Sequence, residues 1–176
     1  MRSRILAAMS AVFAIMMLSV ALADSGLQAS LADPAWDGKT IPPGQQCHRF
    51  GGEASTPRLK VSDIPQGTQA LVLAFSDRDY PPMNHGGHGQ IGYRLPTRVK
   101  QTIVPSVPGH TFTLPPGFFL IKAHANPKWD KPGAYMPPCS GGKGHEYYVT
   151  VQAVTLNAYG KPDKVLGQTV VEMGRY

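Results

Sequence analysis

The sequence is poor in charged residues, and this scarcity excludes several classes of protein. Only 16% of the 176 residues are charged, which argues against an intrinsically disordered chain. The basic residues are scattered, without a basic stripe or an interleaved aromatic platform, so nothing indicates nucleic-acid binding. The sequence also has no internal repeat, no low-complexity tract and no long amphipathic periodicity, which argues against a repeat protein and against long helices.

Turn-forming residues, by contrast, are abundant, with 19 Gly and 17 Pro. Many turn formers and short apolar runs predict an all-β fold. The clearest strands are the apolar run at residues 71–76 and the alternating pattern at residues 147–154. Shorter candidates lie at residues 59–61, 90–95 and 118–121. We therefore predict a single-domain antiparallel β-sandwich with long loops and little helix, in a chain long enough for one core.

The first 23 residues are typical of a signal peptide. A basic start with Arg2 and Arg4 precedes an apolar stretch at residues 5–20, and small residues follow at positions 21 and 23. We expect cleavage before Asp24 and a periplasmic or secreted protein with no membrane span after cleavage. The alternative is an uncleaved anchor, because the apolar stretch is nearly long enough to span a bilayer.

The mature chain is expected to consist of a flexible arm at residues 24–35 and one domain at residues 36–176. Removing the signal peptide leaves 15 basic and 11 acidic residues, a net charge of +4. This charge would help to attract an anion or an anionic membrane surface.

The two cysteines, Cys47 and Cys139, are candidates for a disulfide. An even pair of cysteines in an exported chain favours a bond. Two separate thiols, or a metal site shared with nearby histidines, are the alternatives. The 92-residue separation and the lack of a Cys-x-x-Cys motif make a poor zinc signature.

Two stretches gather polar side chains that can carry chemistry. The run at residues 71–76 ends in Asp77 and Asp79, and a glycine-rich loop with His85 and His88 follows. A second cluster lies far along the chain, at residues 135–147. A buried strand that ends in two carboxylates places them in or beside a cleft.

Seven short motifs, in order along the chain, together resemble the phosphatidylethanolamine-binding protein family, in its bacterial Raf kinase inhibitor-like branch. The motifs span nearly the whole mature chain. They are GKTIP at residues 38–42, the cysteine at 47, TPRL at 56–59, PQGT at 65–68, DRDYP at 77–81, PPCSG with HEY at 137–141 and 145–147, and GRY at 174–176.

The resemblance is incomplete at several positions. Arg78, Tyr80 and Glu146 replace the residues usual in the family, and the stretch after Val154 is too short for the helix that family members usually carry there. The histidine of the family's pocket matches His88 with a shift of one residue, which leaves His85 as a rival.

The resemblance implies a pocket for a phosphate or a similar oxyanion. The implied site residues are Asp77, Asp79, His88, Pro138, His145 and Tyr147. The two histidines and the tyrosine hydroxyl would donate hydrogen bonds, and the glycine loop at residues 141, 142 and 144 would expose backbone N–H groups. Asp77 would act through a histidine, because a carboxylate repels an anion directly. The alternatives are that Asp77 caps a turn and that Asp79 forms a surface ion pair.

The function that we predict is therefore an exported binding protein for a small anionic ligand or a phospholipid head group. It is not expected to be an enzyme or to need a cofactor, because no Gly-x-Ser-x-Gly or other nucleophile motif is present. One alternative is an interaction or inhibitor module that binds an unknown protein partner. Another is a metal-binding hydrolase that uses the Asp and His cluster, although the spacing matches no zinc signature and no metal ligands are predicted.

Overall fold

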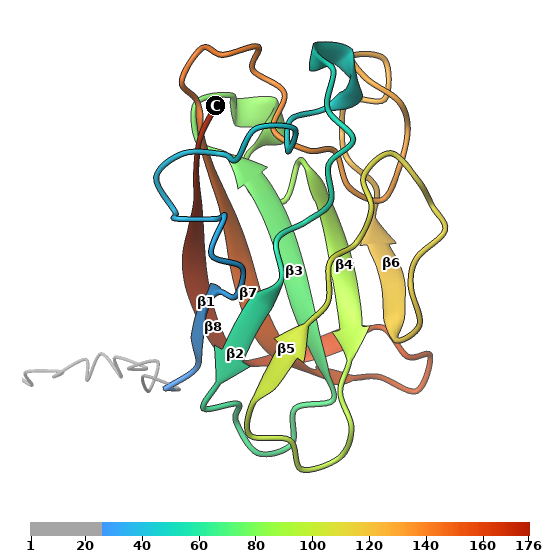
Figure 1. Cartoon of the computed structure of the whole chain (residues 1–176). Coiled ribbons are helices and arrows are strands. Elements are labelled where there is room, and N and C mark those ends of the chain that lie inside the picture. Colours follow the sequence, from blue (N-terminus) through green and yellow to red (C-terminus); the bar gives the residue numbers. More distant parts are fainter. Residues whose placement is uncertain (1–25) are drawn as a thin grey trace, which may run out of the picture.

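The computed structural model describes residues 26–176 and arranges their strands in two antiparallel sheets (Figure 1). The smaller sheet has the order β1-β2-β5, with β1 (Gln28–Leu31), β2 (Leu59–Ser62) and β5 (Thr102–Val104). The larger sheet has the order β6-β4-β3-β7-β8. Its strands are β3 (Ala70–Asp77), β4 (Gly89–Arg94), β6 (Phe118–Lys122), β7 (Glu146–Leu156) and β8 (Pro162–Arg175).

Helical structure in the described residues is limited to two single 3-10 turns, η1 (His48–Phe50) and η2 (Pro81–Met83). The predicted all-β antiparallel sandwich with little helix is therefore confirmed. The expected signal peptide lies outside the described residues. No helix within residues 26–176 is long and apolar enough to cross a membrane.

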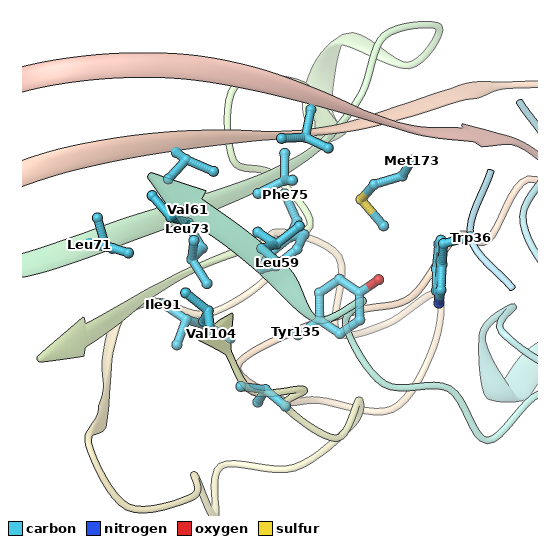
Figure 2. Packing of buried hydrophobic residues seen from close by; sticks show 14 of the residues in the cluster. Trp36, Leu59, Val61, Leu71, Leu73, Phe75, Ile91, Val104, Tyr135 and Met173 are labelled. Atoms are coloured by element: carbon cyan, nitrogen blue, oxygen red, sulfur yellow. The ribbon is translucent and has the colours of Figure 1, made fainter. Parts of the chain in front are cut away.

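The hydrophobic core lies between the two sheets (Figure 2). Leu59, Val61 and Val104 come from the smaller sheet and pack against inward-facing residues of the larger one. On β3 those residues are Leu71, Leu73 and Phe75, which alternate along the strand as a buried face requires. Burial of each such side chain stabilises the fold by about 1.5–3 kcal/mol relative to full exposure.

The alternation on β3 and β7 also positions polar residues. Asp77 ends β3 on the same face as Leu73 and Phe75, and it pairs with Tyr147 on β7 in the antiparallel register. Tyr147 in turn shares a face with Val149 and Val151, which are fully buried. The inner face of the larger sheet therefore ends in an Asp–Tyr pair at one edge of the core.

The flexible arm expected at residues 24–35 includes a strand. Residues 28–31 form β1, which pairs with residues 59–62 of β2. The reason is a short apolar alternation, since Leu27 is buried and Ala29 and Leu31 pack against the core. The many polar neighbours of these residues hide that signal in the sequence.

The connection between β7 and β8 is a tight turn, as the short sequence there indicates. The side-chain oxygen of Asn157 accepts hydrogen bonds from the backbone N–H groups of Tyr159 and Lys161. The chain therefore passes directly from β7 to β8, without the helix that resemblance to the family would suggest.

Cys47 and Cys139 form a disulfide, with their Cα atoms 5.2 Å apart. The bond joins the segment before η1 to the long loop between β6 and β7. A backbone hydrogen bond from Cys47 N–H to the carbonyl of Pro138 lies beside it. The predicted disulfide is thus present, and it fixes one wall of the cavity described next.

Candidate functional site

A cavity of about 190 Å³ opens at the end of the sandwich where β3 ends and β7 begins. Four of the six predicted site residues line it, namely Asp77, His88, His145 and Tyr147. In Figure 1 this is the upper end of the sandwich, where the loops that precede β7 and follow β3 meet. The cavity is small compared with the 300–1,000 Å³ typical of ligand pockets, so it suits a small ligand or one group of a larger one.

Asp77 uses both of its carboxylate oxygens. Oδ1 accepts hydrogen bonds from the backbone N–H groups of Asp79 and Tyr80, at 2.8 and 3.2 Å. Oδ2 lies 2.7 Å from Nδ1 of His145. Asp77 therefore caps the turn after β3 and also orients the histidine, so the two roles weighed from the sequence occur together.

His145 is left with one ring nitrogen for the cavity. Because a carboxylate oxygen only accepts, Nδ1 of His145 donates its proton to Asp77. Nε2 is then an acceptor in the neutral ring and a donor in the protonated ring. The backbone N–H of His145 donates to the carbonyl of Tyr176, so the position of the ring is also fixed from the main chain.

His88 is buried, and its geometry differs from the donor role expected for it. Nδ1 lies 2.7 Å from the carbonyl oxygen of Met136, so Nδ1 carries the proton. Burial lowers the pKa of His88 to about 4. The ring is therefore neutral at pH 7, and Nε2 can accept a hydrogen bond but cannot donate one.

Tyr147 links the strand to the disulfide loop. Its hydroxyl oxygen accepts the backbone N–H of Cys139 at 3.1 Å. Its ring lies edge-on to the His88 ring, with centroids 5.3 Å apart. Burial is the main reason that the pKa of Tyr147 lies above its ordinary value, so the hydroxyl keeps its proton.

The other two predicted site residues lie outside the cavity lining. Asp79 is exposed, and its Oδ2 accepts the backbone N–H of Glu146 at 2.7 Å. Pro138 is buried, and its carbonyl accepts the N–H of Cys47. Of the two rival histidines, His88 lines the cavity and His85 is exposed on the surface.

Several lining residues were missed from the sequence. Lys143 adds the cation of the glycine loop, and Ser140 adds a hydroxyl that donates to the carbonyl of Tyr176. Asn126 and Trp129 come from the loop after β6. Lys143 could have been found as the one cation between the loop glycines. Nothing in the sequence marks Asn126 and Trp129 as cavity residues, because their position depends on how the long loop after β6 folds back.

The sequence matches the family model for phosphatidylethanolamine-binding protein over residues 32–174. The chain belongs to the phosphatidylethanolamine-binding protein (PEBP) family. The match includes β2 to β7 and all of β8 except its last residue, so both the cavity and its disulfide lie within the PEBP region. Comparison with curated proteins finds no significant match.

Two solved PEBP structures resemble the present one. E. coli YbcL, a member of the mammalian PEBP family, aligns with a TM-score of 0.54 and 18% identity, over 85% of this chain and 97% of YbcL. The PEBP homologue CT736 of Chlamydia trachomatis aligns with a TM-score of 0.49 and 22% identity, over 85% of this chain and 96% of CT736. At these identities the likeness to YbcL supports the PEBP fold.

Two of the residues that depart from the PEBP pattern contact each other. Arg78 Nε lies 3.8 Å from a carboxylate oxygen of Glu146. Arg78 also pairs with Glu172, and Glu146 pairs with Arg175 of β8. All four side chains are at least 39% exposed, so each pair adds at most about 1 kcal/mol. Arg78 and Glu146 therefore form surface ion pairs outside the cavity lining, whereas the third departure, Tyr80, lines the cavity.

One group in residues 26–176 has three potential metal-ligand atoms within 4.8 Å of one another. It consists of Cys47, Asp130 and Cys139. The residues of the metal-hydrolase alternative, Asp77, Asp79, His85, His88 and His145, form no such group in that part of the chain.

Proposed function

We propose that the protein is a binding module for a small anion, either phosphate or the phosphate of a phospholipid head group. The pair formed by His145 and Asp77 at the cavity wall is the observation that carries this proposal. The carboxylate fixes the ring through Nδ1, so Nε2 is the ring atom left for a ligand, and it donates a hydrogen bond when the ring is charged. Lys143 lines the same cavity and adds a cationic donor.

The neutral His88 narrows the choice of anion. Its Nε2 is an acceptor at pH 7, so it is best satisfied by a ligand that also donates a hydrogen bond. Hydrogen phosphate has a protonated oxygen, and phosphoethanolamine has an ammonium group. Sulfate has neither, so a site with a buried acceptor should bind sulfate more weakly.

Calorimetric titration of the purified protein tests this proposal. Inorganic phosphate and phosphoethanolamine should bind at one site, with sulfate at least about tenfold weaker, which corresponds to about 1.4 kcal/mol. His145→Gln should weaken phosphate binding by roughly tenfold to a hundredfold, because a charge-assisted hydrogen bond contributes about 1.5–3 kcal/mol. His85→Gln is the matched control, since His85 is exposed and outside the cavity lining. Equal loss in both variants, or none in either, would place the anion elsewhere.

Comparison of the two phosphate compounds separates the possible sources of the anion. Tighter binding of phosphoethanolamine than of phosphate would favour a phospholipid head group. Equal binding would indicate that the cavity recognises the phosphate alone.

We also propose that the protein is exported, with its mature N-terminus at Asp24. The signal pattern in the sequence supports export, and the disulfide is consistent with it, because such bonds persist in oxidising compartments. N-terminal sequencing of the protein from the periplasm or the medium should start at Asp24. Recovery of the full-length chain in the membrane fraction would favour the uncleaved anchor.

A further inference from the structure

A buried carboxylate lies directly against the disulfide. The Oδ2 atom of Asp130 is 4.0 Å from the sulfur of Cys139. The carboxylate oxygen and the two sulfur atoms all lie within 4.8 Å of one another. Cys47 is fully buried, Cys139 is 6% exposed, and the Asp130 side chain is 4% exposed. A neutral disulfide gives this carboxylate no hydrogen-bond donor, so its donors come from other groups.

The same carboxylate is held in place by three other groups. Nε2 of His110 lies 2.6 Å from Oδ2 of Asp130. Backbone N–H groups of Lys131 and Arg49 also interact with the carboxylate. A metal-binding carboxylate is usually oriented by such partners, which hold it ready for the ion.

We propose that Cys47, Cys139 and Asp130 bind a divalent transition metal, with Zn²⁺ as the best fit, when the disulfide is reduced. Two thiolates and one carboxylate form a three-ligand set suited to zinc. Histidine is a common zinc ligand, but here His110 would not bind the metal itself. It would donate a hydrogen bond to the ligand Asp130 and so orient it. Neither this site nor its metal is part of the anion-binding function proposed above.

A dithiol reductant transfers two electrons to the Cys47–Cys139 bond by thiol–disulfide exchange and becomes a disulfide itself. Its two protons pass to the cysteine sulfurs, which become thiols. Zn²⁺ then displaces both protons to the solvent as it binds the two thiolates.

The distances fit a zinc site after a small movement. Tetrahedral zinc with bonds of about 2.3 Å to sulfur and 2.1 Å to oxygen separates the two ligand atoms by roughly 3.6 Å. The distance from Cys139 Sγ to Asp130 Oδ2 is 4.0 Å, close to that value. The two sulfurs must separate from bonding distance to roughly 3.8 Å, which loss of the covalent bond permits.

The cavity supplies a route for the ion. Cys139 and Trp129, the residue before Asp130, both line it. A site with three protein ligands keeps a fourth position for water or a small ligand.

Cobalt titration under anaerobic conditions tests the proposal. The protein is reduced with a phosphine, which donates the same two electrons, and Co²⁺ is added as a spectroscopic probe. The reduced protein should show a thiolate-to-cobalt charge-transfer band that saturates at one ion per chain, and Zn²⁺ should abolish it. The oxidised protein should show no such band.

Two substitutions show whether the structured site binds the ion. Asp130→Asn should weaken Co²⁺ binding by roughly tenfold or more, at least as much as loss of an outer partner does. Asp163→Asn is the matched control, because Asp163 is an exposed residue of β8. Each variant is purified in the oxidised form, so its fold can be checked by circular dichroism before reduction.

The proposal is overturned if the reduced protein shows no charge-transfer band. It also fails if Asp130→Asn binds Co²⁺ as tightly as the unaltered chain. That result would indicate that two thiols of an unfolded chain bind the ion without Asp130. X-ray absorption of the reduced zinc-bound protein provides a measurement without any substitution. It should show two sulfur ligands at about 2.3 Å and oxygen ligands at about 2.1 Å, whereas four sulfur ligands would indicate a zinc-bridged dimer.

Discussion

Asp77 and His145, which are 68 residues apart in the sequence, lie with Oδ2 and Nδ1 2.7 Å from each other. The sheet brings them together, because Asp77 ends β3 and pairs with Tyr147 near the start of β7. Asp77 is held on its other side by two backbone N–H groups of its own turn. The orientation of His145 therefore depends on the register between two central strands as well as on the loop that carries it.

Replacing Asp77 by Asn should weaken phosphate binding by up to about tenfold, the equivalent of roughly 1.4 kcal/mol. The neutral amide makes a weaker hydrogen bond to Nδ1 of His145 than the carboxylate does, so the ring is held less firmly at the cavity wall. Calorimetric titration with phosphate checks this. Asp79→Asn is the control, since Asp79 is exposed and lies outside the cavity lining, and a larger effect there would contradict the assignment.

Stability should fall as the pH is lowered from about 6.5 to 4, because of His88. Its pKa is about 4 in the folded protein, mainly because of burial, and about 6.5 in an unfolded chain. The unfolded state therefore binds a proton first, and His88 lowers the free energy of unfolding by up to about 3 kcal/mol across this range. Above pH 6.5 His88 is neutral in both the folded and the unfolded state, so it no longer makes the free energy of unfolding depend on pH. Urea denaturation at several pH values measures the slope.

A pair of variants isolates the contribution of His88. His88→Asn keeps a donor for the carbonyl of Met136 but cannot titrate, so its pH slope should be smaller. His85→Asn should keep the original slope, because His85 is exposed and its backbone φ of 49° suits Asn. An equal slope in all three proteins would show that other groups cause the pH dependence.

Two buried tyrosines should respond oppositely to loss of their hydroxyl groups. The Tyr135 hydroxyl is buried without a hydrogen-bond partner, so Tyr135→Phe should be neutral or stabilise the fold by about 1 kcal/mol. The Tyr147 hydroxyl accepts the N–H of Cys139, so Tyr147→Phe should destabilise it by about 1–3 kcal/mol. Thermal unfolding of the two variants compares them, and a greater loss for Tyr135→Phe would reveal an unrecognised partner in the core.

Removing the disulfide should lower the free energy of unfolding by about 4 kcal/mol, because the bond closes a long loop in the unfolded chain. The double variant Cys47→Ser with Cys139→Ser should therefore unfold at lower urea, with metal chelated throughout. Its denaturant slope should also rise, because the unfolded chain exposes more surface without the cross-link. An unchanged midpoint would mean that the bond does not stabilise the fold.

The sequence revealed the parts of the molecule that depend on local patterns. The alternation at residues 147–154 and the apolar run ending at Asp77 predicted β7 and β3, and these two strands carry Tyr147 and Asp77 of the cavity lining. The disulfide followed from two cysteines and an export signal. The short strand β1 was missed, because Leu27, Ala29 and Leu31 are too few to stand out and their burial depends on β2.

The sequence did not reveal how each cavity group is used. We expected His88 to donate a hydrogen bond to the ligand. The contact of Nδ1 with the carbonyl of Met136 shows that the other ring nitrogen, Nε2, is an acceptor. Asp130 gave no sequence signal, since nothing local places residue 130 beside residues 47 and 139. Such roles depend on contacts between distant loops, which periodicity and motif spacing do not encode.

The two tryptophans of the chain lie in different surroundings, so the fluorescence of one of them reports on the cavity. Trp129 is 41% exposed, lines the cavity and donates its indole N–H to the carbonyl of Cys139, whereas Trp36 is 7% exposed within the core. Arg49 lies 4.1 Å from the Trp129 ring centroid. Fluorescence of Trp129 should therefore shift when the cavity fills or the disulfide opens, while Trp36 supplies a constant reference inside the same molecule.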